Sequence, residues 1–125
     1  MTKREITGTR ELEFSQWIRD ELPSSKTAFM VSDLDFILWN YRSKRMMFIE
    51  VKTNSHDVFK FQRIMFTQMA KWIQRGIDQC RDGWSFLGYH EIVFERKNFQ
   101  DGKCWLNKRE VTEQQLIEFL SLTQP

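Results

Sequence analysis

The sequence predicts an α/β fold in which helices pack on one central mixed β-sheet. Two neighbouring stretches, 34–40 and 46–52, are apolar on both faces, as central strands covered on both sides are. Stretches with helical periodicity precede and follow them, at 9–22 and 57–75. Further strands and a last helix follow within a total of 125 residues, and this alternation is typical of a single layered domain.

Each predicted helix carries a start or stop signal. Thr9 is a suitable N-cap for the helix at 9–22, which has an apolar stripe of Phe14, Ile18 and Leu22. Gly76 is expected to end the helix at 57–75. The segment 111–122 predicts a short final helix, because Thr112 is followed by Glu and Gln in the first turn.

The remaining strands are expected around these helices. A first strand is predicted at 27–31, ahead of the pair at 34–40 and 46–52. Residues 84–96 predict one or two strands, and 98–107 predict a hairpin with Asp101-Gly102 at its turn. Residues 84–125 are therefore expected to complete the sheet.

Composition sets broad limits on location and partners. The net charge is only +2, so a nucleic-acid partner would need a local basic surface. Cys80 and Cys104 lack metal-ligand spacing and are expected to be reduced thiols of a cytoplasmic protein. The N-terminal stretch shows no apolar secretory signal, and no stretch approaches the roughly 20 apolar residues that span a membrane, so no membrane association is expected.

Three carboxylates and a lysine stand within the most apolar part of the chain. Asp33 and Asp35 share one face of their strand, and Glu50 and Lys52 share one face of the next. A hairpin turn centred on 42–43 places Asp35 opposite Glu50, and Asp33 opposite Lys52.

Two carboxylates on directly opposed residues in an apolar setting repel each other. A buried anion is also costly unless its charge is compensated. The pair has three outcomes open to it: a shared proton, an ion pair with Lys52, or a bound divalent metal. Carboxylate oxygens select Mg²⁺, Mn²⁺ or Ca²⁺ rather than zinc. Ordinary solvated charges on a surface hairpin are the alternative, and the apolar flanks on both faces weigh against it.

A polar residue stands at the head of the apolar stripe of each of the first two helices. Glu11 precedes the stripe of the first helix. Gln62 precedes a stripe made of Met65, Phe66, Met69 and Ile73. We expect both side chains to reach toward the strand pair, although each alone is also compatible with an ordinary helix end near solvent.

Basic residues form two groups that could contact a phosphate backbone. One group follows a line on the second helix, and the other lies in the hairpin turn: Lys60, Arg63, Lys71 and Arg75, then Arg42, Lys44 and Arg45. A solvated polar face is the commoner explanation for such charges. Contacts of this kind position a nucleic acid without reading its sequence.

The series Asp35, then Glu50-Val51-Lys52, resembles the PD-(D/E)xK nuclease superfamily of restriction endonucleases and Holliday-junction resolvases. That family's core order is α-β-β-β-α-β, with a Glu on the first helix and a Gln on the helix after the lysine strand. Glu11 and Gln62 match those two positions, and the segment 35–62 is also similar to the VRR-type nucleases.

The sequence departs from the family at one position, where Leu34 replaces the usual Pro before the acidic residue. Asp35 is taken as the metal ligand because it is in register with Glu50, and Asp33 is the second choice.

The resemblance implies a restriction-endonuclease-like domain over 1–125, with its catalytic core at about 9–75. It implies hydrolysis of DNA with Mg²⁺ or Mn²⁺ held by Asp35, Glu50 and the backbone carbonyl of Val51. Lys52 would orient the attacking water or stabilise the phosphate. Glu11 would hold a second metal or its water, and Gln62 would position the lysine or contact the substrate.

The resemblance leaves the substrate open. An endonuclease of DNA repair or recombination is expected ahead of an exonuclease, and DNA ahead of RNA; symmetric cleavage would call for a homodimer. A non-catalytic nucleic-acid-binding domain on the same fold is the first alternative. A protein-interaction module that uses exposed aromatic residues is the second, although aromatic residues are more often part of a core.

Overall fold

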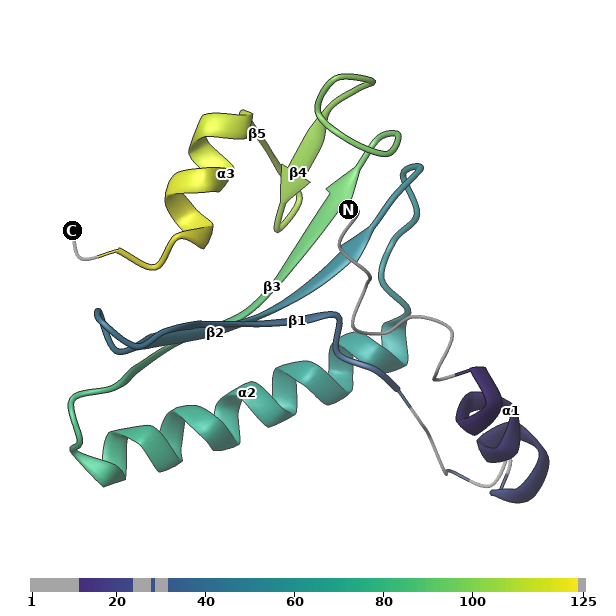
Figure 1. Cartoon of the computed structure of the whole chain (residues 1–125), viewed down its shortest axis with the longest axis horizontal. Coiled ribbons are helices and arrows are strands. Elements are labelled where there is room, and N and C mark those ends of the chain that lie inside the picture. The colour runs from purple at the N-terminus through teal and green to yellow at the C-terminus, as the bar shows by residue number, and fades with distance from the viewer. Residues whose placement is uncertain (1–11, 24–27, 29–31, 124–125) are drawn as a thin grey trace. The chain divides into compact units, whose positions relative to one another are not determined.

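The computed structural model describes residues 12–23, 28 and 32–123 (Figure 1). The chain divides into two compact units, 1–32 and 33–125, and each is described by itself. The first contains α1 (Leu12–Glu21). The second contains β1 (Phe36–Asn40), β2 (Arg45–Lys52), α2 (Lys60–Cys80), β3 (Ser85–Phe94), β4 (Cys104–Leu106), β5 (Arg109–Val111) and α3 (Glu113–Leu120).

The first unit contributes one described helix, which confirms the helix predicted around 9–22. Phe14 and Trp17 lie one turn apart on α1, and their rings stack with centroids 5.8 Å apart. Most of the strand predicted at 27–31 lies outside the described residues, and Ala28 within it is in a turn. Glu11 also lies outside them.

The second unit is built on one five-stranded mixed sheet, as the α/β prediction requires. The strand order is β1-β2-β3-β4-β5, with β2 and β3 parallel and the other neighbours antiparallel. A parallel pair needs a crossover connection, and α2 supplies it between β2 and β3. Within the described ranges, no helix combines the length and the apolar character needed to cross a membrane.

The two strands expected to be central differ in position. In β2, four consecutive residues from Met47 to Glu50 are buried, because β1 and β3 flank this strand. β1 is the edge strand of the described sheet, and Phe36, Ile37 and Trp39 on it are exposed. The prediction of a central strand is therefore confirmed for β2 and wrong for β1, because apolar composition alone does not locate the sheet edge.

The two faces of the sheet carry different layers (Figure 1). Met47 and Ile49 point to one face and form the main core with Leu116 of α3 and with Leu122. α2 lies along the opposite face. There, the rings of Phe48 and Phe86 meet edge to face, and Phe66 of α2 contacts Tyr89. Glu50 and Lys52 belong to this α2 face, since they alternate in phase with Phe48.

A bulge in β3 sets which of its side chains face α2. Met46 pairs with Phe86, but Phe48 pairs with Tyr89, so β3 uses one residue more than β2 over this interval. Gly88 lies in the bulge with φ +93°, a conformation that favours glycine. The extra residue brings both Phe86 and Tyr89 onto the α2 face.

Capping and turn residues in the sequence predicted the start of α3 and the turn before β4, but not the turn after β4. α3 begins after Thr112 with a complete capping box to Gln115, as predicted. The turn between β3 and β4 contains Asp101-Gly102, and the Asn98 side chain accepts bonds from two amides of the loop. The two-residue turn between β4 and β5, with positive φ at Asn107 and Lys108, was not predicted.

The helix predicted to end at Gly76 continues to Cys80. Its C-cap is Arg81, which takes the left-handed conformation with φ 53°. Gly76 is tolerated inside the helix because a single glycine costs only about 1 kcal/mol. Cys80 is an exposed free thiol and Cys104 is a buried one, and burial raises the pKa of Cys104 to about 11.

Gly76→Ala is expected to stabilise the protein by about 0.5–1 kcal/mol, since alanine has the higher helix propensity. Apart from the helix's own backbone and the two neighbouring residues, no heavy atom lies within 4 Å of where its Cβ would stand. Urea denaturation measures the change. Gly88→Ala is the matched control and should destabilise, because its φ is positive. A loss of stability in Gly76→Ala would contradict a continuous helix at this position.

Candidate functional site

The start of β1 and the end of β2 are joined by two crossed bonds between backbone and carboxylate. The amide of Asp35 donates to Oε1 of Glu50 at 2.9 Å. The amide of Val51 donates to Oδ2 of Asp35, also at 2.9 Å. The β1–β2 ladder begins at Phe36↔Ile49, so these bonds continue the predicted register, in which Asp35 lies opposite Glu50. Each carboxylate is thereby fixed by the backbone of the other strand.

Glu50 is the buried charged residue of the described core, with 1% of its surface exposed. Burial raises the pKa of Glu50, since a low-dielectric site disfavours the charged form. The Asp35 amide lowers that pKa by bonding to the carboxylate, whereas the negative charge of Asp35 raises it. The two carboxyl groups are close enough to share a hydrogen bond, which raises the pKa of Glu50 further.

Lys52 stands two residues beyond Glu50 on the same face of β2. Its positive charge lowers the pKa of Glu50, although less than burial raises it. Its Nζ lies 5.3 Å from the centroid of the Phe59 ring, within the range of a cation–π contact. Phe59 is the N-cap residue of α2, so this contact places the lysine between the end of β2 and the start of the helix.

The other predicted site residues are placed unequally. Asp33 is exposed in the coil before β1, and the described carboxylate bonded to β2 is that of Asp35, which favours Asp35 of the two. Gln62 is half-buried in the first turn of α2, at the head of the stripe that contains buried Phe66. Glu11 is not among the described residues, so its predicted role stays a prediction.

The pair presents oxygen atoms suited to a small hard cation. Together the two crossed bonds use one oxygen of each carboxylate, Oε1 of Glu50 and Oδ2 of Asp35. The Val51 carbonyl points to the same strand edge as its amide, which faces Asp35. Mg²⁺ commonly binds one or two carboxylates and keeps several waters, so this donor set fits it. No group of three His, Cys, Asp or Glu side chains able to hold a metal occurs within 12–23, 28 and 32–123.

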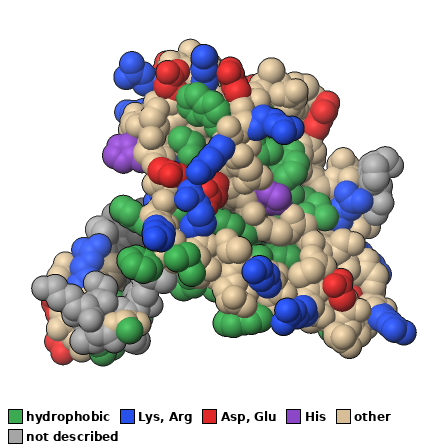
Figure 2. Space-filling model, turned by 180° about the vertical axis from the view of Figure 1, so that it is seen from behind, with side chains coloured by type: hydrophobic (Ala, Val, Ile, Leu, Met, Phe, Trp, Pro, Cys, Tyr) green, Lys and Arg blue, Asp and Glu red, His purple; other side chains and the backbone are tan. Residues whose placement is uncertain are grey.

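The predicted basic residues lie in three kinds of surroundings. Those that are exposed on α2 and the hairpin turn are Lys60, Lys71, Arg75, Arg42 and Lys44. Arg45 is half-buried and donates to the Thr123 carbonyl at 3.1 Å. Figure 2 shows Lys and Arg side chains interspersed with Asp, Glu and hydrophobic ones over the described part of one face, rather than one continuous basic surface.

Arg63 differs from the other residues of the predicted basic line on α2, because its guanidinium is bonded to carboxylates of the protein itself. Its Nε and Nη2 donate to the two oxygens of Glu91 at 2.8 Å, and Nη2 also donates to Oδ1 of Asp57 at 2.8 Å. The Tyr89 hydroxyl donates to Oε2 of Glu91 at 2.9 Å. These bonds raise the pKa of Arg63 and direct its guanidinium toward carboxylates rather than toward a phosphate.

Glu91 connects this cluster to the carboxylate pair. It pairs with Glu50 in the parallel β2–β3 register, so Asp35, Glu50 and Glu91 form a row across three strands. Sequence reasoning did not identify Glu91, because it is separated from Arg63 by 28 positions and from Glu50 by the whole crossover. Many sequences contain an arginine in a helix and an acidic residue in a later strand, so this pattern does not predict that Arg63 and Glu91 form a pair.

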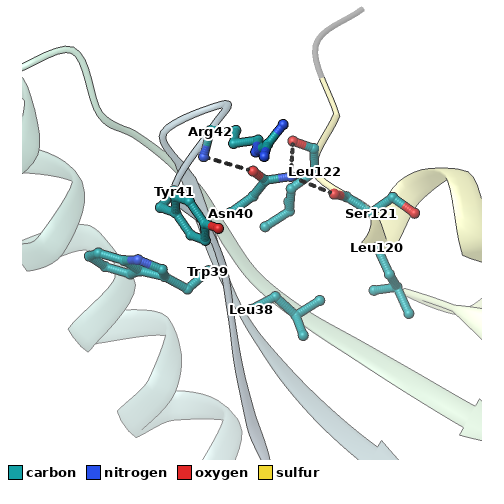
Figure 3. Close-up of a pocket in the computed structure, with 8 residues that line it drawn as sticks. All are labelled: Leu38, Trp39, Asn40, Tyr41, Arg42, Leu120, Ser121 and Leu122. Carbon is teal, nitrogen blue, oxygen red and sulfur yellow. Dashed lines mark hydrogen bonds between the residues drawn. The ribbon is translucent and has the colours of Figure 1, made fainter.

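A separate hollow of about 320 Å³ lies at the other end of β1, between the hairpin turn and the end of α3 (Figure 3). Its lining includes Leu38, Tyr41 and Leu120. The side-chain amide of Asn40 donates to the carbonyls of Ser121 and Leu122 at 3.1 and 3.4 Å. These bonds connect the end of α3 to the hairpin. The hollow is therefore part of a structural junction that holds the edge strand.

Glu50→Gln is expected to stabilise the metal-free protein by roughly 1 kcal/mol at neutral pH. The amide has no charge to bury, and its oxygen can still accept the bond from Asp35. Because the folded-state pKa of Glu50 is raised, wild-type stability falls as pH rises from the ordinary value of 4.5 through the raised one. Thermal denaturation in EDTA at several pH values measures both effects.

The variant should lack the part of this pH dependence that Glu50 causes, and its advantage should disappear in acid, where the wild-type carboxyl is protonated. Equal stability of the two proteins at neutral pH, or a destabilised variant, would show that burial of the Glu50 charge carries no cost.

Arg63→Met is expected to destabilise the protein by about 1–3 kcal/mol, because it leaves Glu91 without its cation while only 12% of the Glu91 side chain is exposed. Urea denaturation measures the loss. Asp57→Asn is the control and should change stability by less than about 1 kcal/mol, since 63% of that side chain is exposed. Similar losses in both variants would contradict the dominant role of the Glu91 pair.

Comparisons with known proteins supply no relative from which a role could be transferred. No protein-family model matches the chain, and no curated protein and no solved structure matches it. Functional inference therefore depends on the described contacts, above all on the crossed bonds of Asp35, Glu50 and Val51.

Proposed function

We propose that this protein is a metal-dependent nuclease that hydrolyses phosphodiester bonds of DNA. The observation that carries the proposal is the pair Asp35 and Glu50, each fixed by a backbone amide of the opposite strand, with Lys52 on the same face. The proposal includes a restriction-endonuclease-like core. A hairpin, a crossover helix and a parallel strand support that fold.

A divalent cation would resolve the electrostatic conflict of the pair. Mg²⁺ or Mn²⁺, held by Asp35, Glu50 and the Val51 carbonyl, would supply Lewis-acid chemistry toward the phosphate. Glu50 is buried and the exposed carboxylate of Asp35 is held close to it, which favours such an ion, because its charge offsets both the repulsion between the two groups and the desolvation of Glu50. Glu11 completes this proposal as the acidic residue expected to serve a second metal or its water.

Lys52 is proposed to act directly on the reacting phosphate. Its ammonium is a compact donor that can bond to a phosphate oxygen as negative charge increases there, or orient the attacking water. The Phe59 ring lies under the Lys52 ammonium at the start of α2. Gln62, one turn further along that helix, is proposed to position the lysine or to contact the substrate backbone.

DNA binding is proposed to use the exposed basic residues around this face. Lys60, Lys71 and Arg75 on α2, together with Arg42 and Lys44, can neutralise phosphates without reading bases. Affinity from such contacts falls steeply with salt. Arg63 is assigned to the structural pair with Glu91 instead.

Lys52→Ala is expected to lower the rate of DNA cleavage by about 100-fold or more, as the loss of one transition-state donor does. The assay incubates supercoiled, linear, single-stranded, flap and four-way-junction DNA with Mg²⁺, Mn²⁺ or EDTA. Lys97→Ala is the matched control, because it removes the same charge from an exposed loop position. Circular dichroism checks that each variant remains folded.

Calorimetry with Mn²⁺ separates the roles within the site. Lys52→Ala should still bind the ion, whereas Glu50→Gln should lose that binding. Cleavage by Lys52→Ala at the wild-type rate would refute the assignment of the lysine. DNA binding without cleavage of any of these substrates would instead favour a non-catalytic nucleic-acid-binding domain.

A further inference from the structure

Two hollows lie next to each other beyond the end of β2, and they share one residue. The first, the lysine hollow, measures about 270 Å³ and is lined by Val51, Lys52, Thr53, Asn54 and His56. The second, the tryptophan hollow, measures about 290 Å³ and is lined by Ser55, His56, Asp57, Val93, Trp105 and Lys108. Since His56 borders both, the two hollows lead from the proposed catalytic lysine toward β4.

A tight turn fixes the position of His56. Asn54 and Ser55 both take positive φ, at 56° and 58°, and the His56 amide donates to the Thr53 carbonyl at 3.2 Å. This is the type I′ arrangement, which is unusual without glycine. The Asn54 amide donates to the carbonyl of Arg96, in the loop after β3, at 2.8 Å, and the Ser55 amide donates to the carbonyl of Phe94 in β3 at 2.9 Å. The backbone therefore presents an exposed histidine side chain beside Lys52.

The floor of the tryptophan hollow is apolar and lies on the same face as the carboxylate pair. Lys52 pairs with Val93 across β2–β3, and Val93 pairs with Trp105 across β3–β4. Paired residues share a face, so this row runs from the lysine to the indole over two strand spacings, about 10 Å. Trp105 is half-buried, so part of its indole is held by the sheet and part is accessible from the hollow.

The rim of the tryptophan hollow provides positive charge. Lys108 is exposed in the two-residue turn that follows β4, and it lines the hollow together with Asp57. The Asp57 carboxylate bonds to Arg63 at 2.8 Å, which offsets its repulsion toward an anion. An apolar aromatic floor with a lysine ammonium and an imidazole at its edge matches a nucleotide, whose base stacks and whose phosphate binds donors.

We propose that the tryptophan hollow binds one unpaired nucleotide next to the scissile bond, with its base against Trp105 and its phosphate between His56 and Lys108. The position of this nucleotide next to the scissile bond rests on the proposed nuclease function, whereas the nucleotide site itself does not. Stacking on Trp105 needs an open base face, so the substrate has an unpaired segment at this point, as single strands and flaps do.

Binding of a fluorescein-labelled oligodeoxythymidine, measured by anisotropy in EDTA, tests the site without any cleavage. Wild type should bind it more tightly than the matching duplex. Lys108→Gly should weaken binding about tenfold and reduce the salt slope by about 1, as loss of one phosphate contact does. Glycine suits the positive φ of this turn position, so the fold is kept. His56→Ala should also weaken binding, and Trp105→Leu by about tenfold.

Arg81→Gly is the matched control, because it replaces a basic residue of positive φ at the far end of α2. It should bind as wild type does. Photocrosslinking of an iododeoxyuridine-labelled strand, mapped by mass spectrometry, should label the peptide that contains Trp105. This readout holds even where Trp105→Leu fails to fold.

The site is overturned where wild type binds no oligonucleotide, where Lys108→Gly and His56→Ala bind as wild type does, or where the crosslink maps elsewhere. These outcomes are separate from the nuclease test. Cleavage that depends on Lys52, with unchanged binding by Lys108→Gly and His56→Ala, would overturn the nucleotide site alone. Weakened binding by these variants in a protein that cleaves nothing would support the site and reject the nuclease.

Discussion

The sheet must keep the carboxyl group of Glu50 out of water on its central strand. An isolated buried carboxylate is costly, and here a backbone amide and a nearby ammonium compensate it in part, whereas the second carboxylate adds repulsion. The same contacts determine where β1 begins its approach to β2, since Asp35 both donates to Glu50 and accepts from Val51. The two hydrogen bonds that fix the start of the β1–β2 hairpin therefore also fix the positions of the site's carboxylates.

The acidic residues on the α2 face of the sheet differ in how fully their negative charge is compensated. Glu91 has a bidentate arginine and a tyrosine hydroxyl, which satisfy most of its acceptor capacity. Asp35 and Glu50 receive one backbone amide each, and their mutual repulsion persists. We infer that Arg63 stabilises the packing of α2 on β3, whereas the carboxylate pair, which is compensated only in part, is available for ligand chemistry.

The sequence predicted the parts of this arrangement that depend on short-range rules. The β1–β2 register followed from the turn centre at Arg42 and Ser43, because an antiparallel hairpin leaves little freedom once its turn is placed. The start of α3 followed from Thr112 and its capping box. These elements need no knowledge of distant partners.

Features that depend on long-range packing could not be predicted in the same way. The parallel pairing of Glu50 with Glu91 is set by how α2 packs during the crossover, and the bidentate contact of Arg63 follows from that packing. The edge position of β1 was missed because its composition resembles that of β2. Gly76 was misleading because the low helix propensity of a single glycine does not end the helix, which continues to Cys80.

The bulge at Gly88 gives β3 a place where its length can change without an exchange of its two faces. Side chains of a strand alternate between two environments, and the extra residue lets Phe86 and Tyr89, three positions apart, face the same side. Loss of one residue between them would make the β2 and β3 intervals equal, so every later position of the strand would keep its side. Ile92 would stay in the apolar core, and Glu91 would stay beside its arginine. Loss of a residue between Tyr89 and Ile92 would instead move Ile92 out of that core, so a deletion is absorbed only at the bulge.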